Sequence, residues 1–180
     1  MNPPRASAAR PPTAPSRRKP SVTITPPPVQ RRRRSRAQVV SRRRVAGVTA
    51  AAVKRDADAI LALLAVDGEL SIALVSDAEI HALNHAYRGK DRPTDVLAFA
   101  LREGENPHVH ADVLGDVVIS LDTAARQAAA RGHGIAHEVR FLLAHGILHL
   151  LGYDHERSPA EARRMFAKQR RLLSVLSRDT

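Results

Sequence analysis

Three histidines lie close together in the C-terminal half of this 180-residue chain, at His145, His149 and His155. The first two are four residues apart, about one turn of an α-helix, so both imidazole rings project from the same helix face. Gly152 follows, and a glycine at this point lets the chain leave the helix through a left-handed turn that brings His155 back toward the other two. Three neutral imidazoles hold a zinc ion and leave a fourth position for water. The spacing therefore predicts a catalytic metal site with one Zn²⁺ per chain.

The same ligand spacing is typical of metzincin peptidases, which place zinc ligands at positions i, i+4 and i+10 and a glycine at i+7. Those enzymes carry a glutamate, the general base, directly after the first histidine. In this chain that position is Gly146. A zinc hydrolase of peptides or small molecules is therefore the alternative interpretation, because the ligand set is present and the peptidase base is absent.

The composition restricts the class of protein. The length indicates one domain with an extension. The chain has no cysteine, which excludes disulfides and thiolate zinc sites and fits a reducing compartment. It has no apolar run near the roughly 18 residues that a membrane span needs, and its N-terminus lacks the apolar segment of a secretory signal peptide. We therefore expect a cytoplasmic protein without a membrane partner.

The net charge of +11 is concentrated in the N-terminal quarter. Residues 1–45 contain 13 Lys and Arg and no acidic residue, whereas residues 46–180 contain 16 basic and 18 acidic residues. Proline and like charge at this density predict a disordered basic extension over residues 1–35, followed by an ordered domain over residues 36–180. Three interpretations of the extension stay open: a tail that contacts RNA phosphates non-specifically, an organelle transit peptide, and a start codon assigned too far upstream.

Hydrophobic periodicity and capping residues predict the elements of the domain. Strands are expected over residues 37–41, 70–75, 96–99 and 113–121, and a polar loop over 102–112. Helices are expected over residues 50–65, 77–85, 122–131 and 135–151 and from 159 onward, with N-caps at Thr49, at Ser76 or Asp77, and at Ser158. In the last helix, Ala162, Met165, Phe166, Leu172, Leu173 and Leu176 form the inner side. The fold class is α/β (α+β), with a single small mixed β-sheet of about four strands, about five helices, and the metal site on a helix of the C-terminal half.

Three motifs occur in one order along the domain and resemble the bacterial YbeY endoribonucleases, also called rRNA maturation factors. The first is the histidine run from His145 to His155. The second is Leu83-Asn84 followed by Tyr87-Arg88-Gly89-Lys90-Asp91-Arg92-Pro93-Thr94-Asp95-Val96-Leu97, and the third is Leu114-Gly115-Asp116-Val117-Val118-Ile119. Together they cover about residues 70–157. The chain departs from the family at Ala98 and Ala100, where serine and proline are usual.

The resemblance implies a mixed sheet with helices, one zinc ion held by His145, His149 and His155, and cleavage of single-stranded RNA. It also implies a role in 16S rRNA 3′-end maturation and ribosome quality control, with rRNA and the small ribosomal subunit as partners. Arg88 falls on the family's functionally important arginine. The oligomeric state stays open.

The chemistry of these residue types agrees with that implication. Zinc lowers the pKa of its bound water to near 7 and polarises a phosphoryl oxygen. Charge then builds up on the phosphate in the transition state, and the planar fork of an arginine is suited to stabilise it. We therefore take Arg88 as the candidate catalytic residue. Lys90 and Arg92 beside it either follow the RNA backbone or belong to a solvated turn.

Four further residues keep two interpretations each. Tyr153 either stacks on an RNA base or packs beside the tight turn, and Asp154 either orients the neighbouring metal ligand or caps the turn. Asp116 faces the site or holds a loop, and Glu138 reaches toward the metal or forms a salt bridge. The other six histidines lack convergent spacing and are expected at the surface. A third functional hypothesis, a non-catalytic assembly factor with a structural zinc, is opposed by a site of three ligands without cysteine.

Overall fold

Four strands and five helices follow one another in a computed structural model that describes residues 36–101 and 112–177. The strands are β1 (Arg36–Ser41), β2 (Glu69–Val75), β3 (Val96–Ala100) and β4 (Val113–Ser120). The helices are α1 (Ala50–Leu63), α2 (Asp77–Arg88), α3 (Leu121–Arg131), α4 (Ile135–Leu150) and α5 (Pro159–Leu176), and none of these five is long and apolar enough to cross a membrane. The predicted extension over residues 1–35 and nearly all of the predicted loop lie outside the described residues.

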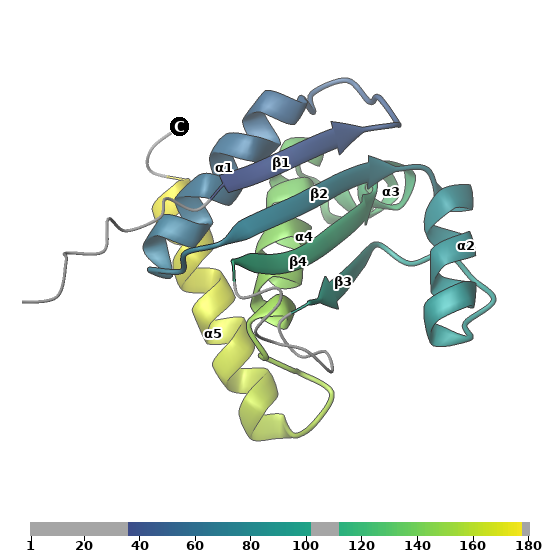
Figure 1. Cartoon of the computed structure of the whole chain (residues 1–180). Coiled ribbons are helices and arrows are strands. Elements are labelled where there is room, and N and C mark those ends of the chain that lie inside the picture. The colour runs from purple at the N-terminus through teal and green to yellow at the C-terminus, as the bar shows by residue number, and fades with distance from the viewer. Residues whose placement is uncertain (1–35, 102–111, 178–180) are drawn as a thin grey trace, which may run out of the picture. The chain divides into compact units, whose positions relative to one another are not determined.

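The strands form one mixed sheet in the order β1-β2-β4-β3 (Figure 1). β1, β2 and β4 run parallel, and β3 pairs antiparallel with β4 at the edge of the sheet. Parallel neighbours need a crossover, which α1 provides between β1 and β2. The prediction of a single mixed sheet of four strands with five helices is confirmed.

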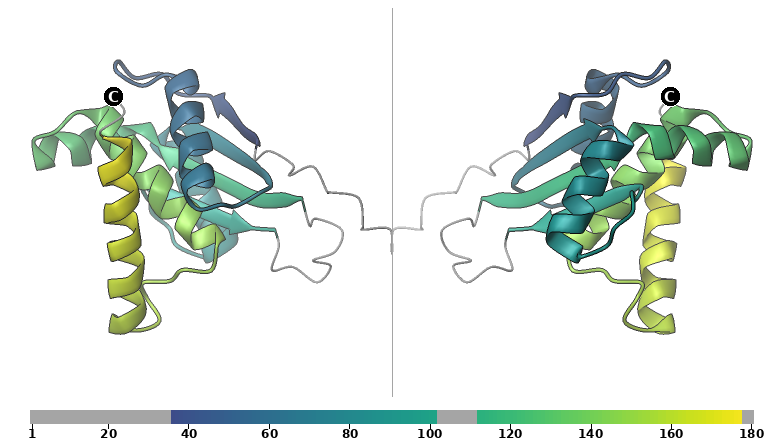
Figure 2. Two further views of the ribbon diagram at one scale, coloured as in Figure 1. Left: turned by 90° about the vertical axis from the view of Figure 1, so that its left-hand side faces the viewer. Right: turned by 90° about the vertical axis from the view of Figure 1, so that its right-hand side faces the viewer.

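The two faces of the sheet are covered differently (Figures 1 and 2). Successive strand residues point to opposite faces, so Leu70, Ile72 and Leu74 join the main core that α1, α4 and α5 complete. Val75 and Val118 point the other way and pack against Ile80 of α2 in a smaller cluster. The helix that carries the first two histidines therefore lies on the main-core face, and α2 lies on the opposite face.

Helix starts agree with the predicted caps. The side chain of Thr49 accepts a hydrogen bond from the backbone N–H of Ala52, and Ser158 does the same for Glu161. Ser76 forms a capping box with Glu79, in which each side chain bonds the other residue's backbone N–H. These local bonds satisfy helix N–H groups that have no partner inside the helix.

Two helix ends differ from the sequence prediction by two or more residues, one helix face differs, and the other boundaries agree to within one residue. α1 ends two residues early, before Ala65, which has a φ of 53°. α2 continues three residues beyond the predicted end, as far as Arg88, because the left-handed residue that ends it is Gly89, with a φ of 63°. Phe166 was predicted on the inner side of the last helix, but it is 39% exposed because its ring stacks on His155 instead of entering the core.

Candidate metal centre

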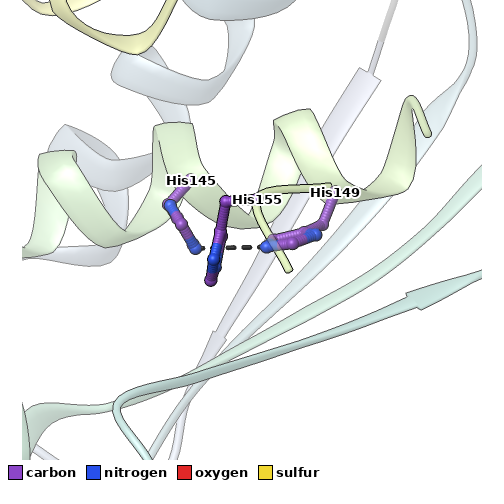
Figure 3. Close-up of side chains that lie close together, drawn as sticks. All are labelled: His145, His149 and His155. Carbon is purple, nitrogen blue, oxygen red and sulfur yellow. Dashed lines mark hydrogen bonds between the residues drawn. The ribbon is translucent and has the colours of Figure 1, made fainter. Parts of the chain in front are cut away.

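The three predicted ligands lie together at the C-terminal end of α4 (Figure 3). The side chains of His145 and His149 leave the same face of the helix, and their Nε2 atoms are 3.1 Å apart. One ring nitrogen from each of these two and from His155 lies within 4.8 Å of the others, and all three rings are half-buried. The predicted juxtaposition of the three histidines is therefore present.

The turn after α4 brings His155 to the other two rings. Gly152 has a φ of 82°, which is the left-handed region that favours glycine. Its backbone N–H donates to the carbonyl of His149, and the N–H of Tyr153 donates to the carbonyl of Leu148. This pair of bonds is the Schellman motif, which reverses the chain at a helix end. The conformation predicted for Gly152 is confirmed.

Burial favours the neutral form of two of the three rings, His145 and His149. Burial lowers the pKa of His145 below its ordinary value of 6.5, although a hydrogen bond with Gln169 opposes the shift. Burial, together with His145 and His155, lowers the pKa of His149 to about 4. Neutral imidazole is the form that binds a metal ion, because the protonated ring has no free lone pair.

The geometry fits a metal ion bound by three nitrogens. Zinc lies about 2.0–2.1 Å from each nitrogen ligand, which places two tetrahedral ligands about 3.3 Å apart. The Nε2 atoms of His145 and His149 are already at 3.1 Å, and a small movement brings His155 to the same distance. Without a metal ion one of these two nitrogens can donate a hydrogen bond to the other, and a bound cation would take the place of that shared proton. These residues can therefore hold a metal ion.

Gly146 explains why the peptidase glutamate is missing. A Cβ atom at this position would lie 2.8 Å from Cγ1 of Val117 and 3.2 Å from Cγ2 of Val96. Carbon atoms normally approach to about 3.5–4.0 Å, so α4 lies against the sheet at a distance that only glycine permits. A glutamate here would point into the sheet, and the metzincin arrangement is incompatible with this packing.

Arg88 lines the same cleft as the three histidines, although about sixty residues separate them in the chain. This cleft has a volume of about 730 Å³ and is also lined by Lys90, Arg92 and Asp95. Within residues 36–101 and 112–177, no hydrogen bond or ion pair holds the side chain of Arg88, which is exposed. It is the last residue of α2, three residues beyond the predicted helix end at residue 85.

Two contacts hold the polar segment that follows α2, residues 89–95. The buried side chain of Asn84 donates a hydrogen bond to the carbonyl of Arg92, at 2.7 Å. The Nε2 atom of His81 is 2.7 Å from a carboxylate oxygen of Asp91. These contacts fix the backbone while the side chains of Arg88, Lys90 and Arg92 stay exposed beside the cleft.

The residues with two interpretations are now placed. Asp154 accepts the backbone N–H of Glu156, a bond that lowers the pKa of its carboxyl, so it closes a turn. Tyr153 packs partly buried against the main core. Asp116 alternates with Val117 along β4 and lines a hollow on the opposite face of the sheet from α4. Glu138 is fully buried and forms an ion pair with Arg131, as the salt-bridge interpretation predicts, and its second carboxylate oxygen lies 3.0 Å from Nε2 of His133.

Two site residues were not singled out from the sequence. Asp95 lines the cleft, and its carboxylate accepts hydrogen bonds from the Val96 N–H and the Gln127 side chain. Gln169 on α5 contacts His145. The sequence pattern of α5 could have pointed to Gln169. It is the polar residue in a buried stripe that also contains Met165, Leu172 and Leu176. A polar side chain in such a stripe needs a hydrogen-bond partner.

A family model described as Endoribonuclease YbeY matches residues 33–177. This chain belongs to the YbeY endoribonuclease family. A relative named Endoribonuclease YbeY from Geobacter metallireducens is 45% identical over 143 residues, which cover 78% of this chain and 95% of that protein. A second, from Geobacter sulfurreducens, is 49% identical over 126 residues, covering 69% of this chain and 84% of the other.

A solved structure shares the fold of this chain. The solution structure of a Thermotoga maritima protein matches with a TM-score of 0.54 and 31% identity, over 77% of this chain and 86% of that one. The family model and the two named relatives confirm the resemblance that the three sequence motifs indicated. In this YbeY family member, the matched region contains the three histidines, Gly146 and Arg88.

Proposed function

We propose that this protein is a zinc-dependent endoribonuclease that cleaves single-stranded RNA in the cytoplasm and acts in 16S rRNA 3′-end maturation and ribosome quality control. The observation that carries the catalytic part is the three-histidine cluster, which shares one cleft with the guanidinium of Arg88, a group with no partner among the described residues. The ribosomal part rests on membership of the family. In this proposal His145, His149 and His155 are the zinc ligands.

When bound, zinc supplies Lewis acidity toward a phosphoryl oxygen and activates water near neutral pH. The protein itself must place the phosphodiester and stabilise the charge that develops on it. The side chain of Arg88 has no partner among the described residues, so its five N–H donors are available to the two non-bridging phosphate oxygens. We assign Arg88 this catalytic role.

The RNA chain needs contacts on both sides of the reacting phosphate. Lys90 and Arg92 extend the positive charge along the wall of the cleft and attract neighbouring phosphates. Tyr87 also lines the cleft and is 69% exposed, with its ring held edge-on against Phe99 at 5.1 Å between centroids. A fixed, exposed aromatic ring offers a stacking surface to an unpaired base, which favours single-stranded over double-stranded RNA.

The test measures zinc content and cleavage of a single-stranded RNA by the wild-type protein and by Arg88→Ala. We expect the variant to keep its zinc and its melting temperature, because Arg88 is exposed and unpaired among the described residues. Cleavage should fall roughly 100-fold or more, the scale on which removal of one transition-state donor acts. Arg88→Lys should not restore full activity, since an ammonium group cannot form the bidentate contact.

Arg55→Ala is the matched control. Arg55 is also an exposed arginine on a helix, but it lies on α1 and does not line the cleft. Both variants lose one positive charge, so a general electrostatic effect on RNA binding would reduce cleavage in both. Near wild-type cleavage by Arg88→Ala would exclude Arg88 from the mechanism, and absence of zinc from the wild-type protein would refute the proposal as a whole.

A further inference from the structure

Gln169 is the buried polar side chain of α5 that lies beside the candidate metal centre. It is 1% exposed, and its neighbours along the inner face of the helix are apolar. A buried amide is costly unless both its donor and its acceptor end find partners. Here the Nε2 group donates to the carbonyl of Phe141 at 3.0 Å, and Oε1 is 3.3 Å from Nδ1 of His145.

The bond to Phe141 decides which end of the amide faces the histidine. A backbone carbonyl only accepts hydrogen bonds, so the amide nitrogen must point at it and the amide oxygen must point at His145. An amide oxygen likewise only accepts, so Nδ1 of His145 must carry the proton. A neutral imidazole has a single N–H, which leaves the lone pair on Nε2, the atom that lies 3.1 Å from Nε2 of His149.

We propose that Gln169 is a positioning residue of the metal centre, which holds His145 in the Nδ1–H tautomer and aims its Nε2 lone pair at the ion. The inference rests on the proposed zinc site and is independent of the RNA chemistry. Phe141 lies one helical turn before His145, so the Gln169 amide spans the turn that carries the ligand. The ring of Phe141 also stacks nearly parallel to that of His145, at 12°, which limits rotation of the imidazole.

The role follows a general requirement of histidine ligands. The ring nitrogen that does not bind the metal needs a hydrogen-bond acceptor, which fixes the tautomer and the ring orientation. Among the described residues, Gln169 is the hydrogen-bond partner of Nδ1 of His145. Since Gln169 comes from α5 and His145 from α4, this single hydrogen bond joins the last helix to the metal site.

The first experiment uses the metal-free wild-type protein labelled with ¹⁵N, because the chemical shifts of imidazole nitrogens distinguish the two tautomers. We expect Nδ1 of His145 to be protonated and Nε2 to be unprotonated at neutral pH. The free imidazole ring of histidine favours the opposite tautomer, so this result would require a partner at Nδ1. An Nε2–H tautomer of His145 in the wild-type protein would overturn the proposal, whatever its nuclease activity.

The second experiment measures Zn²⁺ affinity by competition with a chelator in three variants. Gln169→Met has a similar length but no hydrogen-bonding group, and we expect the Nδ1–H tautomer to be lost and the affinity to fall about 10–100-fold. Gln169→Glu keeps an acceptor for Nδ1 but loses the N–H group that donates to the Phe141 carbonyl, so it should keep the tautomer and bind Zn²⁺ more tightly than Gln169→Met. Leu172→Ala, which loosens α5 at a buried position one turn further on, should lower the melting temperature without changing the tautomer or the affinity.

These variants separate positioning from packing. Unchanged tautomer and zinc affinity in Gln169→Met would overturn the inference, and so would an equal loss of affinity in Leu172→Ala. If Gln169→Met does not fold, the inference is still tested by the tautomer of His145 in the wild-type protein and by the Zn²⁺ affinity of Gln169→Glu. A wild-type protein that binds no Zn²⁺ would refute the proposed metal site itself, whereas an inactive protein with tight zinc and the expected tautomer would refute only the proposed nuclease.

Discussion

Replacing Gly146 by alanine adds one methyl group at the closest approach between α4 and the sheet. The new Cβ would lie 2.8 Å from Cγ1 and 3.3 Å from Cγ2 of Val117, and 3.2 Å from Cγ2 of Val96. The shortest of these is roughly 1 Å less than an ordinary carbon–carbon contact. Val117 is fully buried, and a β-branched side chain has few alternative rotamers, so the helix and the strand must move apart.

Two opposing contributions determine how much Gly146→Ala changes the free energy of unfolding. Overpacking of a filled core costs about 1–3 kcal/mol, whereas replacing glycine by alanine inside a helix gains about 1 kcal/mol. The free energy of unfolding should therefore fall by about 1 kcal/mol, which corresponds to a decrease in melting temperature of about 2–4 °C for a domain of this size. Because His145 precedes Gly146 directly, the shift of the helix should also weaken zinc binding.

A double-mutant cycle with Val117→Ala tests this reasoning. The second substitution removes both valine methyl groups that the new Cβ would meet, so the clash should largely disappear. In the Val117→Ala background we expect Gly146→Ala to stabilise the protein, and the coupling between the two sites to reach about 1 kcal/mol or more, within the range for residues in contact. Urea denaturation gives the four free energies. A Gly146→Ala single variant that is more stable than wild type would refute the argument.

Three further predictions concern the metal, the attachment of α2 and the N-terminal extension. His149→Ala should lose most of the bound metal, measured by elemental analysis, and a variant lacking all three ligand histidines that keeps its metal would move the site elsewhere. Burial raises the pKa of Asp77, but hydrogen bonds from Ser120, Thr123 and Arg126 outweigh it and the pKa is lowered. Asp77→Asn should therefore reduce stability above the unfolded-state pKa of 3.8, and the difference should vanish as the pH falls through the lower folded-state pKa, measured by urea denaturation at several pH values. We propose that residues 1–35 form an extension that is dispensable for folding. A protein that begins near Arg36 should keep its zinc content and lose RNA affinity mainly at low salt, because the arginines of the extension act through counterion release. Loss of folding on removing residues 1–30 would contradict this.

Much of the candidate site could be predicted from the sequence because its geometry is local. His145 and His149 share a helix face through the α-helical repeat, and Gly152 permits the turn that returns His155. The caps at Thr49, Ser76 and Ser158 are equally local, since each side chain bonds a backbone N–H three residues away. Interactions within a few residues depend on bond geometry alone, and the sequence shows them directly.

Contacts between distant segments depend on how the elements pack, which residue spacing does not reveal. The strand order β1-β2-β4-β3 places β3 at the edge and brings Arg88 into the cleft of the histidines. The reason for a glycine at position 146 also lies in the packing. The sequence showed only that a glutamate was missing, whereas the structure shows that Val117 fills the space that a Cβ atom would need.

The contact of Gln169 with His145 is another that residue spacing does not reveal. Twenty-four residues separate the two, and although the apolar stripe of α5 contains Gln169, that stripe does not show which side chain the amide contacts. The sequence by itself determined which side chains can bind a metal, through the fixed geometry of one helix and one turn. Only the tertiary structure decided which side chains surround them, because many weak packing contacts together select one arrangement of the helices on the sheet.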